Sequence, residues 1–138
     1  MNLASHAYLL SASITILALV LYFYMAIRVA GARTKYNIQA PAITGHPGFE
    51  RAYRVQMNTL EAFPVFLPAL WLATAYFTRV GWLPAAIGLL WIVGRFIYMQ
   101  SYIADPAKRG LGFGISALAQ IVLLLLAAGG IVSAWGPT

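Results

Sequence analysis

The sequence predicts an all-α integral membrane protein with four transmembrane helices, and three observations lead to this prediction. Of its 138 residues, 62% are hydrophobic and only 9% are charged, whereas soluble domains carry roughly 25% charged residues. A chain this short could not hide so many apolar side chains in one small core. Four long apolar stretches are separated by short segments that contain proline, glycine or charge. We therefore expect a single domain over residues 1–138, with helices at about 5–34, 49–78, 82–104 and 109–135 in a left-handed bundle.

The first helix is predicted from residues 7–27, which contain no charged side chain. About 20 apolar residues suffice to cross a bilayer as a helix. Small residues at Ala30-Gly31-Ala32 are similar to a signal-peptidase site. However, no positive segment precedes the apolar run, which is longer than the about 7–15 residues usual in a signal peptide. We expect this segment to be retained as a membrane helix.

Proline, glycine and charge mark the limits of the other three helices. A loop is expected at residues 36–48, which contain Pro41, Gly45, Pro47 and Gly48. The second helix begins with polar turns and continues as apolar sequence, and Pro64 and Pro68 are expected to kink it. A turn at residues 79–81 leads into the third helix, which Asp105-Pro106 should end.

Basic residues are concentrated in the first and third loops and their flanks. These cations are Arg28, Arg33, Lys35, Arg51, Arg54, Lys108 and Arg109. The second loop carries only Arg79. Because basic loops stay in the cytoplasm, both termini are expected outside. The net charge of +6 is then explained by membrane topology, and we expect no nucleic-acid partner.

Two helices carry polar stripes near the same cytoplasmic side. In the second helix the spacing of three, four and three places four residues on one face: Arg51, Arg54, Asn58 and Glu61. In the third helix Arg95, Tyr98 and Tyr102 share a face by spacings of three and four. Charge within hydrocarbon is costly and needs a partner or a ligand.

Each of these residues taken alone has an ordinary structural explanation. The cations could flank a loop, the tyrosines could form an interfacial belt, and Asn58 and Glu61 could join helices. The two stripes at matching depth favour a pocket instead. Arg54 and Glu61 lie seven residues apart, a poor separation for pairing on one helix. We therefore expect their partners on a ligand, another helix or another subunit.

The polar inventory favours a small zwitterionic peptide as the ligand. Guanidinium groups bind carboxylates, a buried glutamate suits an ammonium group, and Asn58 and the tyrosines supply neutral hydrogen bonds. The chain has no cysteine and only two histidines, His6 and His46, far apart. No metal site is expected, and any reactive thiol would have to come with the substrate. Apolar surface nearby would admit a lipophilic second substrate.

The segment ERAYRVQMNTLEAFP at residues 50–64 resembles the second-helix signature of the MAPEG family, the membrane-associated proteins in eicosanoid and glutathione metabolism. That signature reads approximately E-R-x-x-R-x-x-x-N-x-x-E-x-F-P. The resemblance continues in GRFIYMQSY at residues 94–102 and in Lys108-Arg109. Among family members, the chain resembles leukotriene-C synthase, the smaller microsomal glutathione S-transferases and their bacterial relatives.

The resemblance implies a homotrimer that binds glutathione, as a co-substrate, between neighbouring subunits near the cytoplasmic face. It implies that glutathione is held by Arg33, Arg54, Gln56, Asn58, Glu61, Tyr98 and Tyr102. It assigns stabilisation of the glutathione thiolate to Arg109 and a structural or rim position to Arg51. A fixed cation near sulfur lowers the pKa of a thiol from its ordinary value of about 8.5.

The implied function is that of a membrane-bound glutathione S-transferase in detoxification. The thiolate would attack a lipophilic electrophile from the bilayer or, as a peroxidase, reduce a lipid hydroperoxide. Ala62 and Arg33-Thr34 depart from leukotriene-C synthase, which has an aromatic residue and a second arginine there. These departures favour a general enzyme over one dedicated to leukotrienes.

Two alternatives remain. One is a non-catalytic membrane scaffold that binds lipid, like the lipoxygenase-activating protein of the same family. The other is a small multidrug transporter with one membrane glutamate, although the arginines beside Glu61 would repel cationic drugs.

Overall fold

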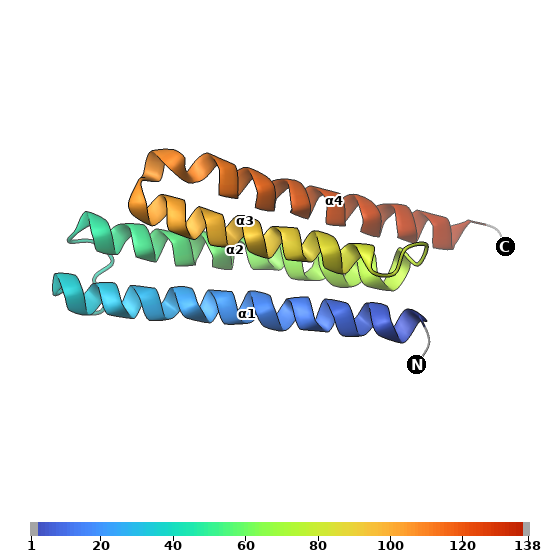
Figure 1. Cartoon of the computed structure of the whole chain (residues 1–138), viewed down its shortest axis with the longest axis horizontal. Coiled ribbons are helices and arrows are strands. Elements are labelled where there is room, and N and C mark those ends of the chain that lie inside the picture. The colour runs from blue at the N-terminus through green and yellow to red at the C-terminus, as the bar shows by residue number, and fades with distance from the viewer. Residues whose placement is uncertain (1–2, 137–138) are drawn as a thin grey trace.

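The computed structural model describes residues 3–136 and consists of long helices packed side by side (Figure 1). Its elements are α1 (Leu3–Tyr36), α2 (Pro47–Tyr76), α3 (Leu83–Ala104), the short 3-10 helix η1 (Pro106–Arg109) and α4 (Gly110–Trp135). Four helices in this part of the chain are long and apolar enough to cross a membrane. The predicted number of membrane helices is therefore confirmed.

Local sequence signals explain where the helices begin and end. His46 caps α2, because its Nδ1 accepts a hydrogen bond of 3.0 Å from the Gly48 amide. Pro47 occupies the first helical position, where no amide hydrogen is needed. Asp105 ends α3, and its carboxylate accepts from the Ala107 amide at 3.0 Å to start η1. The helix α2 continues through Pro64 and Pro68.

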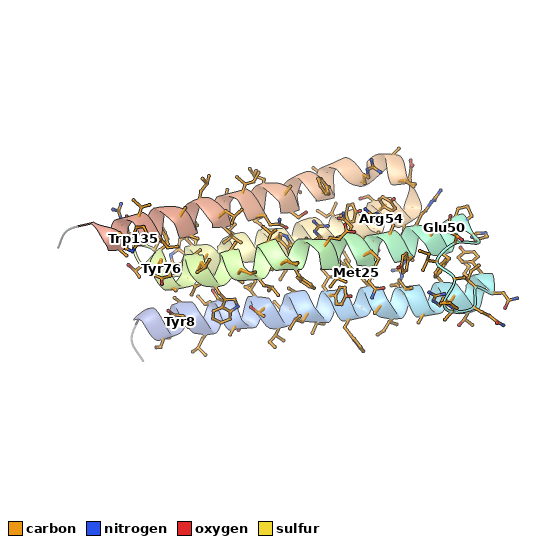
Figure 2. All side chains as sticks on the ribbon, turned by 180° about the vertical axis from the view of Figure 1, so that it is seen from behind. Tyr8, Met25, Glu50, Arg54, Tyr76 and Trp135 are labelled. Carbon is orange, nitrogen blue, oxygen red and sulfur yellow. The ribbon has the colours of Figure 1, made fainter. Side chains whose placement is uncertain are left out.

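The two ends of the bundle differ in the number of basic residues that they carry. Both termini lie at one end in Figure 1, together with the α2–α3 turn that carries Arg79. The opposite end holds the α1–α2 loop, the end of α3 and η1. Figure 2 shows Glu50 and Arg54 toward this basic end, away from Tyr8, Tyr76 and Trp135. The polar stripes of α2 and α3 therefore lie in the same half of the bundle.

An aromatic core joins α2, α3 and α4. The rings of Phe66 and Trp91 stack with centroids 3.9 Å apart and planes within 3°. The indole Nε1 of Trp91 donates a 2.8 Å hydrogen bond to Oε1 of Gln120 in α4. Near the C-terminal end of α2, the hydroxyl of Thr74 shares a 2.7 Å hydrogen bond with the hydroxyl of Ser11 in α1. These contacts fix the register in which the stripes of α2 and α3 face each other.

Candidate functional site

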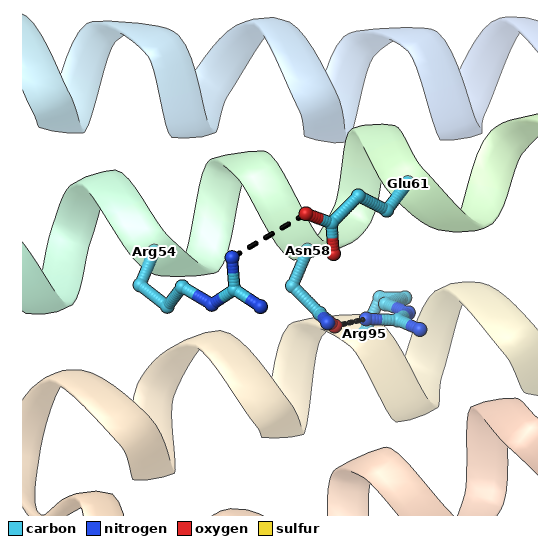
Figure 3. Close-up of polar contacts among 4 residues, drawn as sticks. All are labelled: Arg54, Asn58, Glu61 and Arg95. Carbon is cyan, nitrogen blue, oxygen red and sulfur yellow. Dashed lines mark hydrogen bonds and ion pairs between the residues drawn. The ribbon is translucent and has the colours of Figure 1, made fainter.

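The stripe on α2 contains an ion pair within one helix (Figure 3). One guanidinium nitrogen of Arg54 lies 3.3 Å from Oε1 of Glu61. The sequence prediction that these residues are poorly spaced for pairing is wrong. Seven residues make about two helical turns and a rise of about 10 Å, so both side chains lie on one face and the long arginine side chain spans the rise. Both side chains remain exposed, at 54% and 57%.

The stripe on α3 reaches α2 through a buried arginine. Arg95 is only 3% exposed, and its NH1 donates a 2.6 Å hydrogen bond to Oδ1 of Asn58 (Figure 3). Its guanidinium carbon lies 5.4, 5.3 and 5.8 Å from the ring centroids of Trp91, Tyr98 and Phe113. Three aromatic rings and one amide oxygen therefore surround this cation.

Polar groups from three segments converge on Tyr98. This tyrosine is buried, and its ring lies 5.5 Å from that of Tyr102. The positive charges of Arg54, Arg95 and Arg109 act on the Tyr98 phenol, and the guanidinium carbon of Arg95 lies 5.3 Å from its ring centroid. These arginines belong to α2, α3 and η1, respectively. The candidate site thus centres on a buried phenol beside the Arg95 cation, with two further cations acting on it electrostatically.

A glycine contact brings Arg109 to this centre. A side chain at Gly112 would overlap the backbone of Tyr98, so the absence of a Cβ lets α4 approach α3 closely. Arg109 stands immediately before the first residue of α4 and is exposed. Its charge therefore sits at the positive end of the α4 dipole.

Arg33 and Gln56 do not join this cluster within one chain. Arg33 donates a 2.7 Å hydrogen bond to the Ala42 carbonyl and lies 4.6 Å from the ring centroid of Phe49, so it anchors the α1–α2 loop. Gln56 is two residues beyond Arg54, about 200° around α2, and faces another side of the helix.

Arg51 holds α2 against the end of α3. Its NH1 lies 3.4 Å from the carbonyl oxygens of both Ile103 and Ala104, in the last turn of α3. Cations stabilise the carbonyl end of a helix. This geometry fits the structural position expected for Arg51.

A groove of about 410 Å³ opens beside Arg54. Its walls come from the α1–α2 loop, α2 and α3: Ile43, Thr44, Pro47, Glu50, Arg51, Tyr53, Arg54 and Tyr102. The groove connects the charged stripe of α2 with the basic end of the bundle and could admit a polar ligand of small-peptide size.

Sequence reasoning noted Arg95 on the polar face but gave it no role, and it overlooked Tyr53. A usable signal for Arg95 was present, because an arginine inside a helix without an acidic residue nearby is expensive. Tyr53 gave no comparable signal, since its side chain borders the groove only after the loop has folded. Within residues 3–136 no group of three or more His, Cys, Asp or Glu side chains is arranged to hold a metal.

Comparison with known proteins places this arrangement in a family. The MAPEG family profile matches residues 11–129. Human microsomal glutathione S-transferase 2 is 39% identical over 127 residues, which cover 92% of this chain and 85% of that protein. Bovine leukotriene C4 synthase is 37% identical over 128 residues, covering 93% and 84%. An uncharacterised protein of Synechocystis is 42% identical over 114 residues, covering 83% and 82%. The chain is thus an integral, multi-pass membrane protein that belongs to the MAPEG family.

Proposed function

We propose that this protein is a membrane-bound glutathione S-transferase that can also act as a glutathione-dependent peroxidase. The observation that carries the proposal is the polar face of α2 that holds Arg54, Asn58 and Glu61, joined to the buried cation of α3 by the Asn58–Arg95 hydrogen bond. Glutathione has two carboxylates, one ammonium group and one thiol, and a cluster rich in cations with one acid and several hydroxyl groups complements it. The relatives named for glutathione transfer support this choice of ligand.

The charged pair on α2 would open to receive the peptide part of glutathione. Arg54 would bind a carboxylate and Glu61 the ammonium group. Asn58, Tyr98 and Tyr102 would add neutral hydrogen bonds. Within a single subunit the pair is more than half exposed, and pairs of this kind contribute about 1 kcal/mol or less. Hydrogen bonds to charged groups are worth about 1.5–3 kcal/mol each, so the exchange favours the ligand.

Arg109 would stabilise the thiolate. A fixed cation near the sulfur favours the ionised form, lowering the pKa of the glutathione thiol, and the α4 dipole acts in the same direction. The thiolate then attacks a lipophilic electrophile that enters from the bilayer, forming the thioether as the leaving group departs. With a lipid hydroperoxide, thiolate attack on the O–O bond would give a sulfenic acid and an alcohol, and a second glutathione would then form the disulfide and water.

Assembly as a homotrimer of left-handed bundles would complete the site. Arg54 and Glu61 are over half exposed on a helix of membrane-spanning length, and charge is not left facing lipid. A neighbouring subunit would cover them. Gln56 faces another side of α2 and Arg33 anchors the α1–α2 loop, and both would instead contact the glutathione of an adjacent subunit. The positive-inside rule supports placing this end in the cytoplasm and both termini outside.

The test combines glutathione titration calorimetry in detergent with conjugation of chlorodinitrobenzene. The unaltered protein should bind glutathione saturably and form the conjugate. Arg109→Ala should lower the turnover number about 100-fold at neutral pH, while changing the glutathione Kd only a few fold. Raising the pH past about 8.5 should recover part of the rate, because the free thiol then ionises unaided.

Lys108→Ala is the matched control, since Lys108 is an exposed cation in the same short helix. It should keep the turnover number of the unaltered protein. If Arg109→Ala kept the full turnover number at neutral pH, Arg109 would not be the residue that stabilises the thiolate. Absence of glutathione binding by the unaltered protein would favour the non-catalytic lipid-binding alternative.

A further inference from the structure

Arg95 is a buried cation without a carboxylate. Within the part of the chain that the structure describes, its only hydrogen bond is to Asn58, and its buried Nε has no partner. The one ion pair found there joins Arg54 to Glu61, so no carboxylate pairs with Arg95. Burying such a cation is costly, and an apolar residue of similar volume is often as stable. Fold stability alone therefore does not explain Arg95.

We propose that Arg95 is a positioning residue that fixes the orientation of the Asn58 amide, so that Asn58 acts only as a hydrogen-bond donor toward the ligand. This inference rests on the proposed function, in which Asn58 contacts glutathione. It deepens that function by stating which atoms Asn58 recognises: a carbonyl or carboxylate oxygen, never an ammonium or amide hydrogen.

The hydrogen-bonding groups of the two side chains allow only one pairing. Arginine has five donors and no acceptor, whereas asparagine has one acceptor oxygen and a donor NH2 group. Arg95 can therefore meet only Oδ1 of Asn58, and the 2.6 Å contact joins those atoms. The NH2 group is then not used by Arg95 and remains available as a donor to a ligand. Without Arg95 the side-chain amide of Asn58 could flip and present either Oδ1 or the NH2 group to the ligand.

The absence of an acid beside Arg95 is part of the arrangement. A carboxylate would compete with Oδ1 for the guanidinium donors, because charged hydrogen bonds are stronger than neutral ones. The rings of Trp91, Tyr98 and Phe113 instead stabilise the cation without accepting a strong hydrogen bond. Asn58 is thereby left as the partner of Arg95 and keeps a single orientation.

A double-mutant cycle tests the proposal by titration calorimetry with glutathione in detergent. Arg95→Met and Asn58→Ala should each weaken glutathione binding about tenfold, the value of one good hydrogen bond. Adding Arg95→Met to Asn58→Ala should cause no further loss, because Arg95 acts through Asn58. An equal tenfold loss in the Asn58→Ala background would overturn the proposal and make Arg95 a general structural residue.

A second pair of variants decides the question if Arg95→Met does not fold. Arg95→Lys retains a donor for Oδ1 and should bind glutathione within about threefold of the unaltered protein. Asn58→Asp pairs with Arg95 but cannot donate, so its melting temperature should hold or rise while glutathione affinity falls at least about tenfold. Unchanged affinity in Asn58→Asp would refute the proposal.

The turnover number separates this role from that of Arg109. Asn58→Asp should raise the glutathione KM at least about tenfold, because the loss is in binding, whereas Arg109→Ala should lower the turnover number, because its loss is at the sulfur. For Asn58→Asp, a loss of turnover without a change in KM would contradict the inference. If the unaltered protein bound no glutathione at all, the proposed function itself would fail, which is a different outcome from every result of the cycle.

Discussion

Trp91 and Arg95 lie one turn apart on α3, and both are buried polar residues, yet their surroundings differ. Trp91 is fully buried, stacks on Phe66, and donates its only polar hydrogen to Gln120 at 2.8 Å. Arg95 has one hydrogen bond, an unpartnered Nε and no acid within ion-pair distance among the described residues. The polar group of Trp91 therefore has its partner within the chain, whereas Arg95 keeps a buried nitrogen without one.

This difference separates a packing region from a ligand region along one helix. Buried polar groups that are satisfied stabilise a unique packing, whereas unsatisfied ones are costly. From Trp91 toward the termini, α2, α3 and α4 pack through apolar and aromatic contacts. From Arg95 toward η1, a smaller apolar cluster is joined by charged side chains, and the Arg54–Glu61 pair among them is partly exposed. Variants of the two regions should therefore affect different measurements.

The largest expected effect on stability is in the packing region. Trp91→Ala removes the stacking on Phe66 and leaves Gln120 without its partner, so we expect a loss of about 3–5 kcal/mol of unfolding free energy. Circular dichroism during denaturation in detergent measures this loss. Trp135→Ala is the control, since Trp135 is 87% exposed and should change stability by less than about 0.5 kcal/mol. Equal stability of the two variants would argue against a packing region at Trp91.

Gly112→Ala should have an intermediate effect on stability and should also affect the ligand region. The added methyl group would meet the backbone of Tyr98 and push α4 away from α3, with an expected cost of about 1–3 kcal/mol. Because Tyr98 is the centre of the cation cluster, glutathione binding should weaken as well. Gly114→Ala is matched to it, since nothing lies within 4 Å of a side chain there. That control should be neutral or slightly stabilising, and a similar loss in both variants would contradict the close contact.

Much of the packing region was predictable from sequence, because helix length and punctuation depend on local signals. The Asp105-Pro106 break and the loop before α2 lie where proline and glycine indicate. The start of α2 was expected near Phe49 but lies at Pro47, since the imidazole of His46 caps the helix. The partnership of Trp91 with Gln120 was not predictable, because it depends on the register between two helices.

The ligand region shows which features the spacing of residues along a helix does not predict. Spacing correctly indicated that Arg54, Asn58 and Glu61 share a face. It did not reveal that Arg54 reaches two turns along α2 to Glu61, because spacing specifies a direction around the helix and not a side-chain conformation. It also could not show that Arg33 folds back onto Ala42 and Phe49.

The smallest effect on stability is expected for Glu61→Gln. The Arg54–Glu61 pair is exposed, so its loss should change the unfolding free energy by less than about 0.5 kcal/mol. Two opposite effects act on glutathione binding. Freeing Arg54 favours the ligand by the small energy of an exposed pair, whereas removing the carboxylate leaves the ligand ammonium without a charged partner, at about 1.5–3 kcal/mol.

The second effect is the larger, so glutathione affinity should fall about tenfold while the melting temperature stays unchanged, as calorimetry and thermal denaturation would measure. Glu50→Gln removes one negative charge from the same end of the bundle, where Glu50 accepts a 3.3 Å hydrogen bond from the Gly45 amide. It should leave the affinity within about twofold. Should Glu61→Gln bind glutathione more tightly, release of Arg54 would be the dominant effect, and Glu61 would restrain Arg54 instead of recognising the ligand.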